Sequence, residues 1–247
     1  NMSNKSIDLG KGSIGKLLFT LAIPTIIGQL VNLLYNIVDR IFIGKMSNGD
    51  LAMAGVGVAM PIILLIAAFS MLFAAGGAPL TAIEMGKQDN DKAEEIMSNC
   101  FFMLISGGII LIVVFFIFKE PILWAFGASD ATIVYGLDYL SIYLIGTIFV
   151  QISLGMNLFI NTQGFTKIGM FTVIIGAVIN IILDPIFIFG LNMGVKGAAL
   201  ATIISQCVSA IFVLKFLFGK KSILKIRKKY WYGCNRLFTI STSKQQK

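Results

Sequence analysis

Residues 168–189 read IGMFTVIIGAVINIILDPIFIF, and this stretch decides the class of fold. A helix of that length rises about 33 Å, enough to cross the roughly 30 Å hydrocarbon core of a bilayer. Its single charged residue is Asp184. A carboxylate at that depth costs roughly 2.5–3.5 kcal/mol on insertion scales. The stretch therefore predicts a membrane-spanning helix and also a function for Asp184.

Long charge-free intervals recur along the chain, at 17–38, 51–83, 96–118, 139–166 and 197–214. The chain is 57% hydrophobic and 13% charged, against about a quarter charged in soluble domains. We expect an all-α membrane protein with six transmembrane helices in one lobe. Their expected ranges are 15–43, 52–77, 94–118, 134–158, 168–189 and 197–218, the second ending where Gly76, Gly77 and Pro79 interrupt the apolar run.

Positive charge predicts how the lobe lies in the membrane. With six passes both termini share a side, and that side carries sixteen of the 20 Lys and Arg residues. The positive-inside rule then places the N-terminus (1–14) and the basic tail (219–247) in the cytoplasm, with the lobe (15–218) crossing the plasma membrane. We interpret the net charge of +8 as a sign of how the chain is oriented in the membrane, and not as evidence of a nucleic-acid site. The run 220–229 is expected to lie near anionic lipid, which adds about 1 kcal/mol per basic residue.

Several kinds of chemistry are disfavoured by residue usage. The chain has no His and three Cys, and no pair of Cys has the spacing of a metal site or a disulfide framework. We expect no cofactor, no metal beyond a possible Na⁺, and no enzymatic activity, because the signatures of membrane hydrolases and prenyltransferases are missing. Proton coupling would have to run through carboxylates.

A second carboxylate, Asp39, lies in the first apolar stretch. Asn32, Tyr35, Asn36 and Asp39 follow helical spacing and share one face, as do Asn180 and Asp184. Thr202 lies about one and a half turns into the sixth predicted helix, at a similar predicted depth. Carboxylate, amide and hydroxyl oxygens suit a hard cation such as Na⁺, and a proton would neutralise the site equally. We therefore predict a cation or proton site at Asp39, Asn180, Asp184 and Thr202.

Structural interpretations of the same residues remain open at this point. Asp39 and Arg40 could anchor a helix end at the membrane interface, with both side chains reaching the headgroups. Asp184 with Pro185 could begin an outer turn. Tyr35 and Tyr139 could be core or interface aromatics, and Pro24 could make a static kink.

Four segments resemble the multidrug and toxic compound extrusion (MATE) transporters. These are LAIP at 21–24, YNIVDRIFIG at 35–44, NIILDPIFIF at 180–189 and GVKGAALAT at 194–202. The resemblance runs over residues 13–218 and implies an antiporter that expels cationic, amphipathic compounds in exchange for Na⁺ or H⁺. It places the cation roles on Asp39, Asn180, Asp184 and Thr202. Supporting or cavity roles fall on Tyr35, Tyr139 and Asn157, and Pro24 becomes a hinge.

Family members have two six-helix lobes, and this chain resembles one. We expect it to need a second lobe or a homodimer partner, and the residues after Lys229 resemble a truncated or frameshifted end. Two alternatives stay open. One is a lipid-linked oligosaccharide flippase of the same superfamily, and the other is an inactive or partner-dependent fragment.

Overall fold

The computed structural model describes residues 14–230, and over that range the regular elements are all helices. In chain order they are α1 (Ile14–Gly44), α2 (Gly49–Gly86), α3 (Asn90–Ala125), α4 (Ile133–Ile145), α5 (Thr147–Thr162), α6 (Thr166–Pro185), the π-helix η1 (Ile186–Gly190), α7 (Val195–Leu217) and the 3₁₀ helix η2 (Lys228–Tyr230). The all-α membrane class is confirmed. Within the described residues, five helical spans are long and apolar enough to cross a bilayer, with η1 extending the α6 span, and the count rises to six if the bent pair of α4 and α5 is one span.

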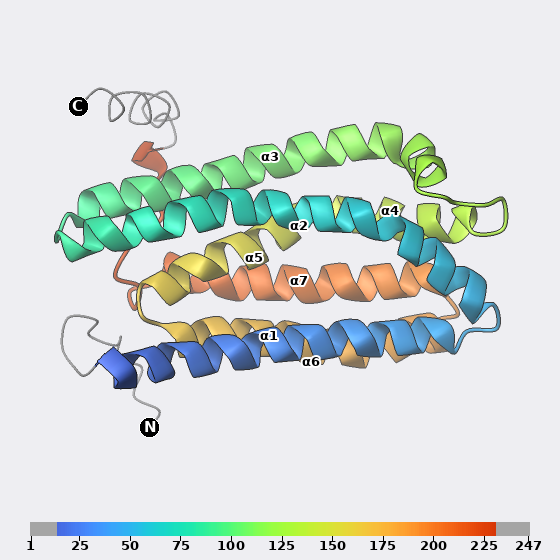
Figure 1. Ribbon diagram of the computed structural model, residues 1–247, viewed down its shortest axis with the longest axis horizontal. Helices are drawn as coiled ribbons and strands as arrows, with labels where there is room; N and C mark the ends of the chain where they lie inside the picture. The colour runs from blue at the N-terminus through green and yellow to red at the C-terminus, as the bar shows by residue number, and fades with distance from the viewer. Residues whose placement is uncertain (1–13, 231–247) are drawn as a thin grey trace.

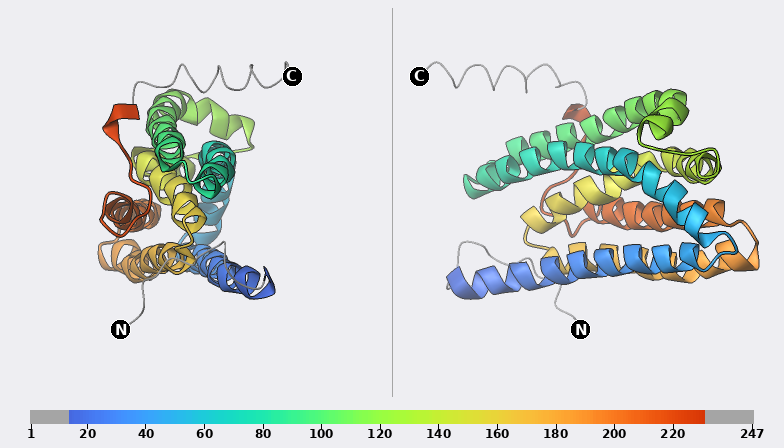
Figure 2. Two further views of the ribbon diagram at one scale, coloured as in Figure 1. Left: turned by 90° about the vertical axis from the view of Figure 1, so that its left-hand side faces the viewer. Right: turned by 45° about the vertical axis from the view of Figure 1, so that its right-hand side comes forward.

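The helices form one bundle (Figure 1). α1 packs along α6, α2 packs along α3 and α5, and α7 packs against both α5 and α6 (Figures 1 and 2). Small side chains such as Ala52, Ala59 and Ala198 are fully buried in the core. Small residues let helix backbones approach closely, which matters in a bilayer because lipid gives no hydrophobic drive for helices to associate.

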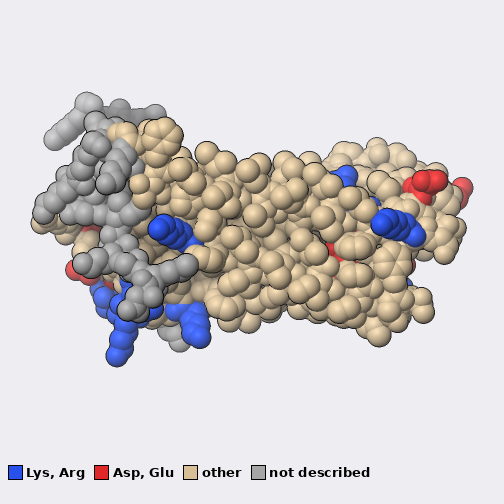
Figure 3. Space-filling view, turned by 90° about the horizontal axis from the view of Figure 1, so that it is seen from below, with Lys and Arg blue, Asp and Glu red and all other residues tan. Residues whose placement is uncertain are grey.

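Charged side chains gather toward the two ends of the bundle. The broad middle of the face made by α1 and α6 is almost free of them (Figure 3), and exposed apolar side chains such as Leu33 and Ile182 lie there. This is the pattern of a surface that contacts hydrocarbon. We call the end where α1 and α6 begin and α7 ends the basic end.

Helix α2 continues to Gly86, so the predicted end near residue 78 is wrong. A Cβ on Gly77 would lie 2.3 Å from Sγ of Cys100 in α3. The glycine therefore serves a close approach of two helices and not a helix end. Pro79 removes one backbone donor, which membrane helices tolerate when their surroundings satisfy the freed carbonyl.

The single helix predicted at 134–158 is also wrong. The structure divides it into α4 and α5, which meet at Gly146 with a bend of 60°. A Cβ on Gly146 would lie 2.5 Å from the Ile203 side chain in α7, so the bend depends on glycine at this point. Beyond it, Gln151 donates from Nε2 to the Ile66 carbonyl at 3.0 Å and ties α5 to α2.

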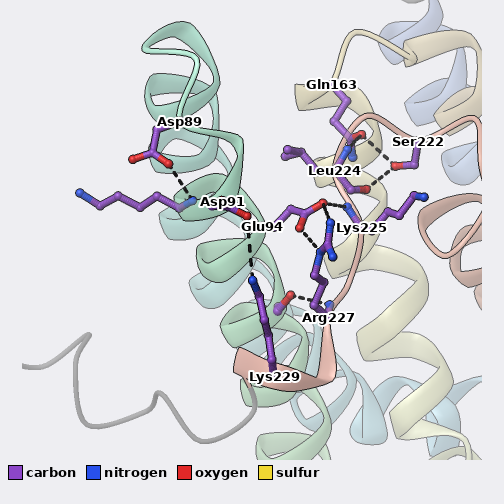
Figure 4. Close-up of polar contacts among 11 residues, drawn as sticks. Asp89, Asp91, Glu94, Gln163, Ser222, Leu224, Lys225, Arg227 and Lys229 are labelled. Atoms are coloured by element: carbon purple, nitrogen blue, oxygen red, sulfur yellow. Dashed lines mark hydrogen bonds and ion pairs between the residues drawn. The ribbon is translucent and has the colours of Figure 1, made fainter.

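The chain after α7 folds back onto the bundle, and we call residues 219–230 the clip segment. The Glu94 carboxylate in α3 is 4% exposed. It accepts hydrogen bonds from the backbone N–H of Lys225, at 3.0 Å, and from Nε of Arg227 (Figure 4). The Arg227 N–H donates to Oγ of Ser98, also at 3.0 Å. The part of the predicted tail that is described is therefore attached to α3.

Candidate functional site

The two membrane carboxylates lie on neighbouring helices. Asp39 is near the C-terminal end of α1, and Asp184 is in the last turn of α6, which packs along α1. Asp39 is 8% exposed and Asp184 is fully buried. They are near enough for the charge of Asp39 to act on Asp184. Neither forms an ion pair with a Lys or Arg in the described part of the chain.

Asn180 and Thr202 join Asp184. Because Asn180 lies four residues before Asp184, the two side chains share a face of α6. Asn180 Nδ2 lies 3.3 Å from Asp184 Oδ1 and 3.5 Å from Thr202 Oγ1 in α7. Within residues 14–230, Asp39 Oδ1, Asp184 Oδ2 and Asn180 Oδ1 are buried without a hydrogen-bond partner. Buried acceptors in that condition call for a donor or a cation.

Two tyrosines border this cluster. Tyr139 is buried, stacks on Tyr143 with ring centroids 5.9 Å apart, and interacts with both Asp39 and Thr202. Tyr35 lies one turn before Asp39 on α1, and the charges of Asp39 and Asp184 both act on its hydroxyl group. Asp39 and Arg40 do not act together as an interface anchor, because the Asp39 side chain is buried and the Arg40 side chain is exposed. Asn36, predicted to share the Asp39 face, is exposed and donates to Asn32 at 2.9 Å.

A cavity of about 120 Å³ lies between α1, α5, α6 and α7, on the basic-end side of the carboxylates. Tyr35 lines it, so the cavity reaches toward the carboxylates. Asn157 also lines it, where Nδ2 donates to Thr172 Oγ1 at 2.6 Å and to the Gly169 carbonyl at 3.0 Å. Its other polar lining residues are Thr25, Gln29, Asn32, Ser153, Asn161, Thr172, Gln206 and Ser209.

Gln206 and Ser153 also line the cavity, and neither is among the site residues predicted from the sequence. Ser153 donates to Gln206 Oε1 at 2.6 Å, and Gln206 also interacts with the Tyr35 hydroxyl. Gln206 lies four residues after Thr202 in α7, so helical spacing from Thr202 could have identified it. Asn157 belongs with this polar cavity, and its hydrogen bonds do not join it to Asp184. Pro24 is buried in α1, which continues without a break through that position.

A bundle of apolar helices that encloses two carboxylates without a basic partner among residues 14–230, together with a polar cavity, defines a membrane protein with an internal polar site. Intramembrane carboxylates of this kind mark ion or proton pathways. The chain belongs to the MatE family, whose family model matches residues 24–186.

Individual relatives agree with this assignment. The chain is 32% identical over 220 residues to the multidrug export protein MepA of Staphylococcus haemolyticus, covering 89% of this chain and 48% of that protein. A MATE crystal structure in the bent conformation superposes with a TM-score of 0.82 at 26% identity, over 88% of this chain and 48% of that one. An outward-facing multidrug resistance MATE transporter of the MOP superfamily gives 0.84 at 25% identity, over 92% and 50%. The chain thus spans about half the length of the relatives it matches.

Proposed function

We propose that this chain forms the N-terminal lobe of a cation-coupled antiporter that exports cationic, amphipathic drugs across the plasma membrane. The observation that carries this proposal is the buried pair Asp39 and Asp184, with carboxylate oxygens that lack partners within the described residues. Leaving two such groups charged and unpaired in a bilayer is costly. A visiting cation removes that cost, and Na⁺ or H⁺ would be the coupling ion.

The site's donor set supports a hard cation or a proton. Asp184 and Asn180 each present a buried oxygen without a partner, and Thr202 adds a hydroxyl on the neighbouring helix. Sodium prefers oxygens of these types. The ion and a cationic drug would both neutralise the same negative charge. Binding of the ion would therefore lower the affinity for the drug, and binding of the drug would lower the affinity for the ion. That competition is the physical basis of exchange.

The polar cavity is the proposed entry for the drug within this lobe. Tyr35 and Asn157 would contact the drug, and Tyr139 would form the wall behind Asp39. Bending of α1 at Pro24 would change the cavity when Asp39 gains or loses its positive partner. Pro24 suits a hinge because a proline inside a helix removes one backbone hydrogen bond.

A second lobe completes the proposed transporter. Alternating access needs two repeats that move against each other, and the relatives are about twice as long as this chain. The partner is either a C-terminal lobe or a second copy of this chain. We propose that both termini lie in the cytoplasm, since the end where α1 begins carries Lys87, Lys92, Lys167 and Lys215.

The cavity lining favours an exporter over a lipid-linked oligosaccharide flippase. Amide and hydroxyl side chains supply its polar part, and neither Lys nor Arg occurs among the described residues that line it. A flippase for anionic lipid-linked sugars needs basic groups in its cavity. If the chain is instead an inactive fragment, supplying a second lobe should restore no transport.

Asp184→Asn tests the proposal. The variant keeps the shape of the side chain but removes its charge, so export of ethidium should fall to background in cells that express the chain with the second lobe of a relative such as MepA. Asp138→Asn is the matched control, because Asp138 pairs with Lys196 at 3.3 Å near the end of the bundle. Unchanged ethidium export by Asp184→Asn would remove Asp184 from the coupling role.

A further inference from the structure

A second hollow lies on the outside of the bundle, where α6 begins and α7 ends. It is an open groove of about 610 Å³ between these two helices. Its walls are apolar and largely aromatic, formed by Ile168, Phe171, Ile175, Phe212 and Phe216, and its rim carries Lys215, Lys220 and Lys221. The Phe165 ring packs edge-on against Phe216 at 5.0 Å and fixes that wall.

The three lysines on the rim have no acidic partner among the described residues. Within residues 14–230 none of them forms an ion pair, and no Asp or Glu lines the groove. Other basic side chains at this end do have acidic partners: Lys87 pairs with Glu84, and Arg227 pairs with Glu94. Lys220 and Lys221 thus combine a place at the groove with the lack of an acidic partner among the described residues, whereas Arg227 and Lys229 in the same run face Glu94 and Asp91.

The clip segment holds two of these lysines in place. Directly after Lys221, Oγ of Ser222 and the N–H of Leu224 both donate to Oε1 of Gln163 at 2.9 Å (Figure 4). Gln163 and Leu224 are almost fully buried. Because the backbone is fixed on both sides, at the end of α7 and at Gln163, the lysines lose little freedom when they bind a ligand.

We propose that this groove binds one anionic phospholipid from the adjacent leaflet, with its phosphate at Lys215, Lys220 and Lys221 and an acyl chain along Phe171 and Phe212. Both phenylalanines are 43% exposed and belong to helical spans that are long and apolar enough to cross a bilayer. Basic pockets between transmembrane helices near a membrane surface favour anionic headgroups. A soluble phosphate would use the rim alone and leave the aromatic wall uncovered.

Lipid binding to the purified, full chain tests the proposal by native mass spectrometry. Phosphatidylglycerol should bind more tightly than phosphatidylcholine with the same acyl chains. The double variant Lys220→Gln/Lys221→Gln should weaken phosphatidylglycerol binding by about thirty-fold, the product of roughly fivefold for each lysine near a membrane surface. The control Lys87→Gln/Lys92→Gln removes the same charge at the same end, outside the groove, and should leave the affinity within about twofold.

Two further arms separate the lipid from other sources of the effect. Inorganic phosphate at millimolar concentration should not displace phosphatidylglycerol, and Phe171→Ala should weaken binding while the exposed Phe116→Ala does not. Equal affinity for the two lipids, equal losses in the two lysine variants, or full displacement by phosphate would overturn the proposal. Should the double variant fail to fold, the single change Lys215→Gln gives the same test with a roughly fivefold effect.

Discussion

The attachment of the clip segment to Glu94 makes the sharpest stability prediction. Glu94→Ala removes the acceptor for the Lys225 N–H, a 3.0 Å hydrogen bond to a carboxylate that is only 4% exposed. Hydrogen bonds to charged groups contribute about 1.5–3 kcal/mol. We take about 2 kcal/mol for this one bond and assign nothing to the exposed Arg227 guanidinium, because solvent screens such pairs. The opened form of the segment should then become about thirty-fold more populated.

Limited trypsin digestion measures this population directly. Cleavage after Lys225 and Arg227 needs the segment detached, and its rate follows the open fraction when reclosing is fast. Glu94→Ala should be cut about thirty times faster at these two bonds, with Glu94→Gln between it and the wild type, because the amide oxygen still accepts one hydrogen bond.

Asp91→Ala is the control, since Asp91 is exposed and lies 3.9 Å from Lys229. Its cleavage rate should change by less than about twofold. Equal rates in Glu94→Ala and Asp91→Ala, with both proteins still folded by gel filtration, would refute the reasoning.

Further predictions concern packing inside the bundle, read from thermal unfolding in detergent. Gly55→Ala should destabilise by about 1–3 kcal/mol, because its Cβ would lie 2.6 Å from a backbone carbonyl of the α3–α4 loop, whereas Gly57→Ala has open space and should not; equal losses would contradict this. Gly146→Ala should cost a similar amount, part of which Ile203→Ala restores in the double variant, since that change removes the atoms 2.5–2.9 Å away; strictly additive losses would count against it. Asn157→Leu should cost about 1 kcal/mol for two lost interhelical hydrogen bonds, and an unchanged midpoint would show that they contribute nothing.

The approximate positions of five passes followed from the sequence, because transfer of a side chain into hydrocarbon is a property of each residue and adds along a helix. The same reasoning singled out Asp39 and Asp184. Spacing on one helix also predicted that Asn180 shares a face with Asp184, which the 3.3 Å contact confirms. Whether these residues bind a cation stays a prediction.

Contacts between helices were beyond the reach of the sequence alone. Glycines at 77 and 146 look identical in a hydropathy profile, yet one lies inside an unbroken α2 and the other at a 60° bend. The difference lies in what each glycine meets, Cys100 in α3 or Ile203 in α7.

The sequence by itself determined that this chain is a membrane protein and that Asp39 and Asp184 lie in its apolar helices. Both conclusions follow from local composition. Only the tertiary structure decided which polar groups share a cavity, how the clip segment attaches to Glu94, and which lysines lack an acidic partner within residues 14–230. These features depend on residues far apart in the chain, and no local property encodes which distant side chain a residue will contact.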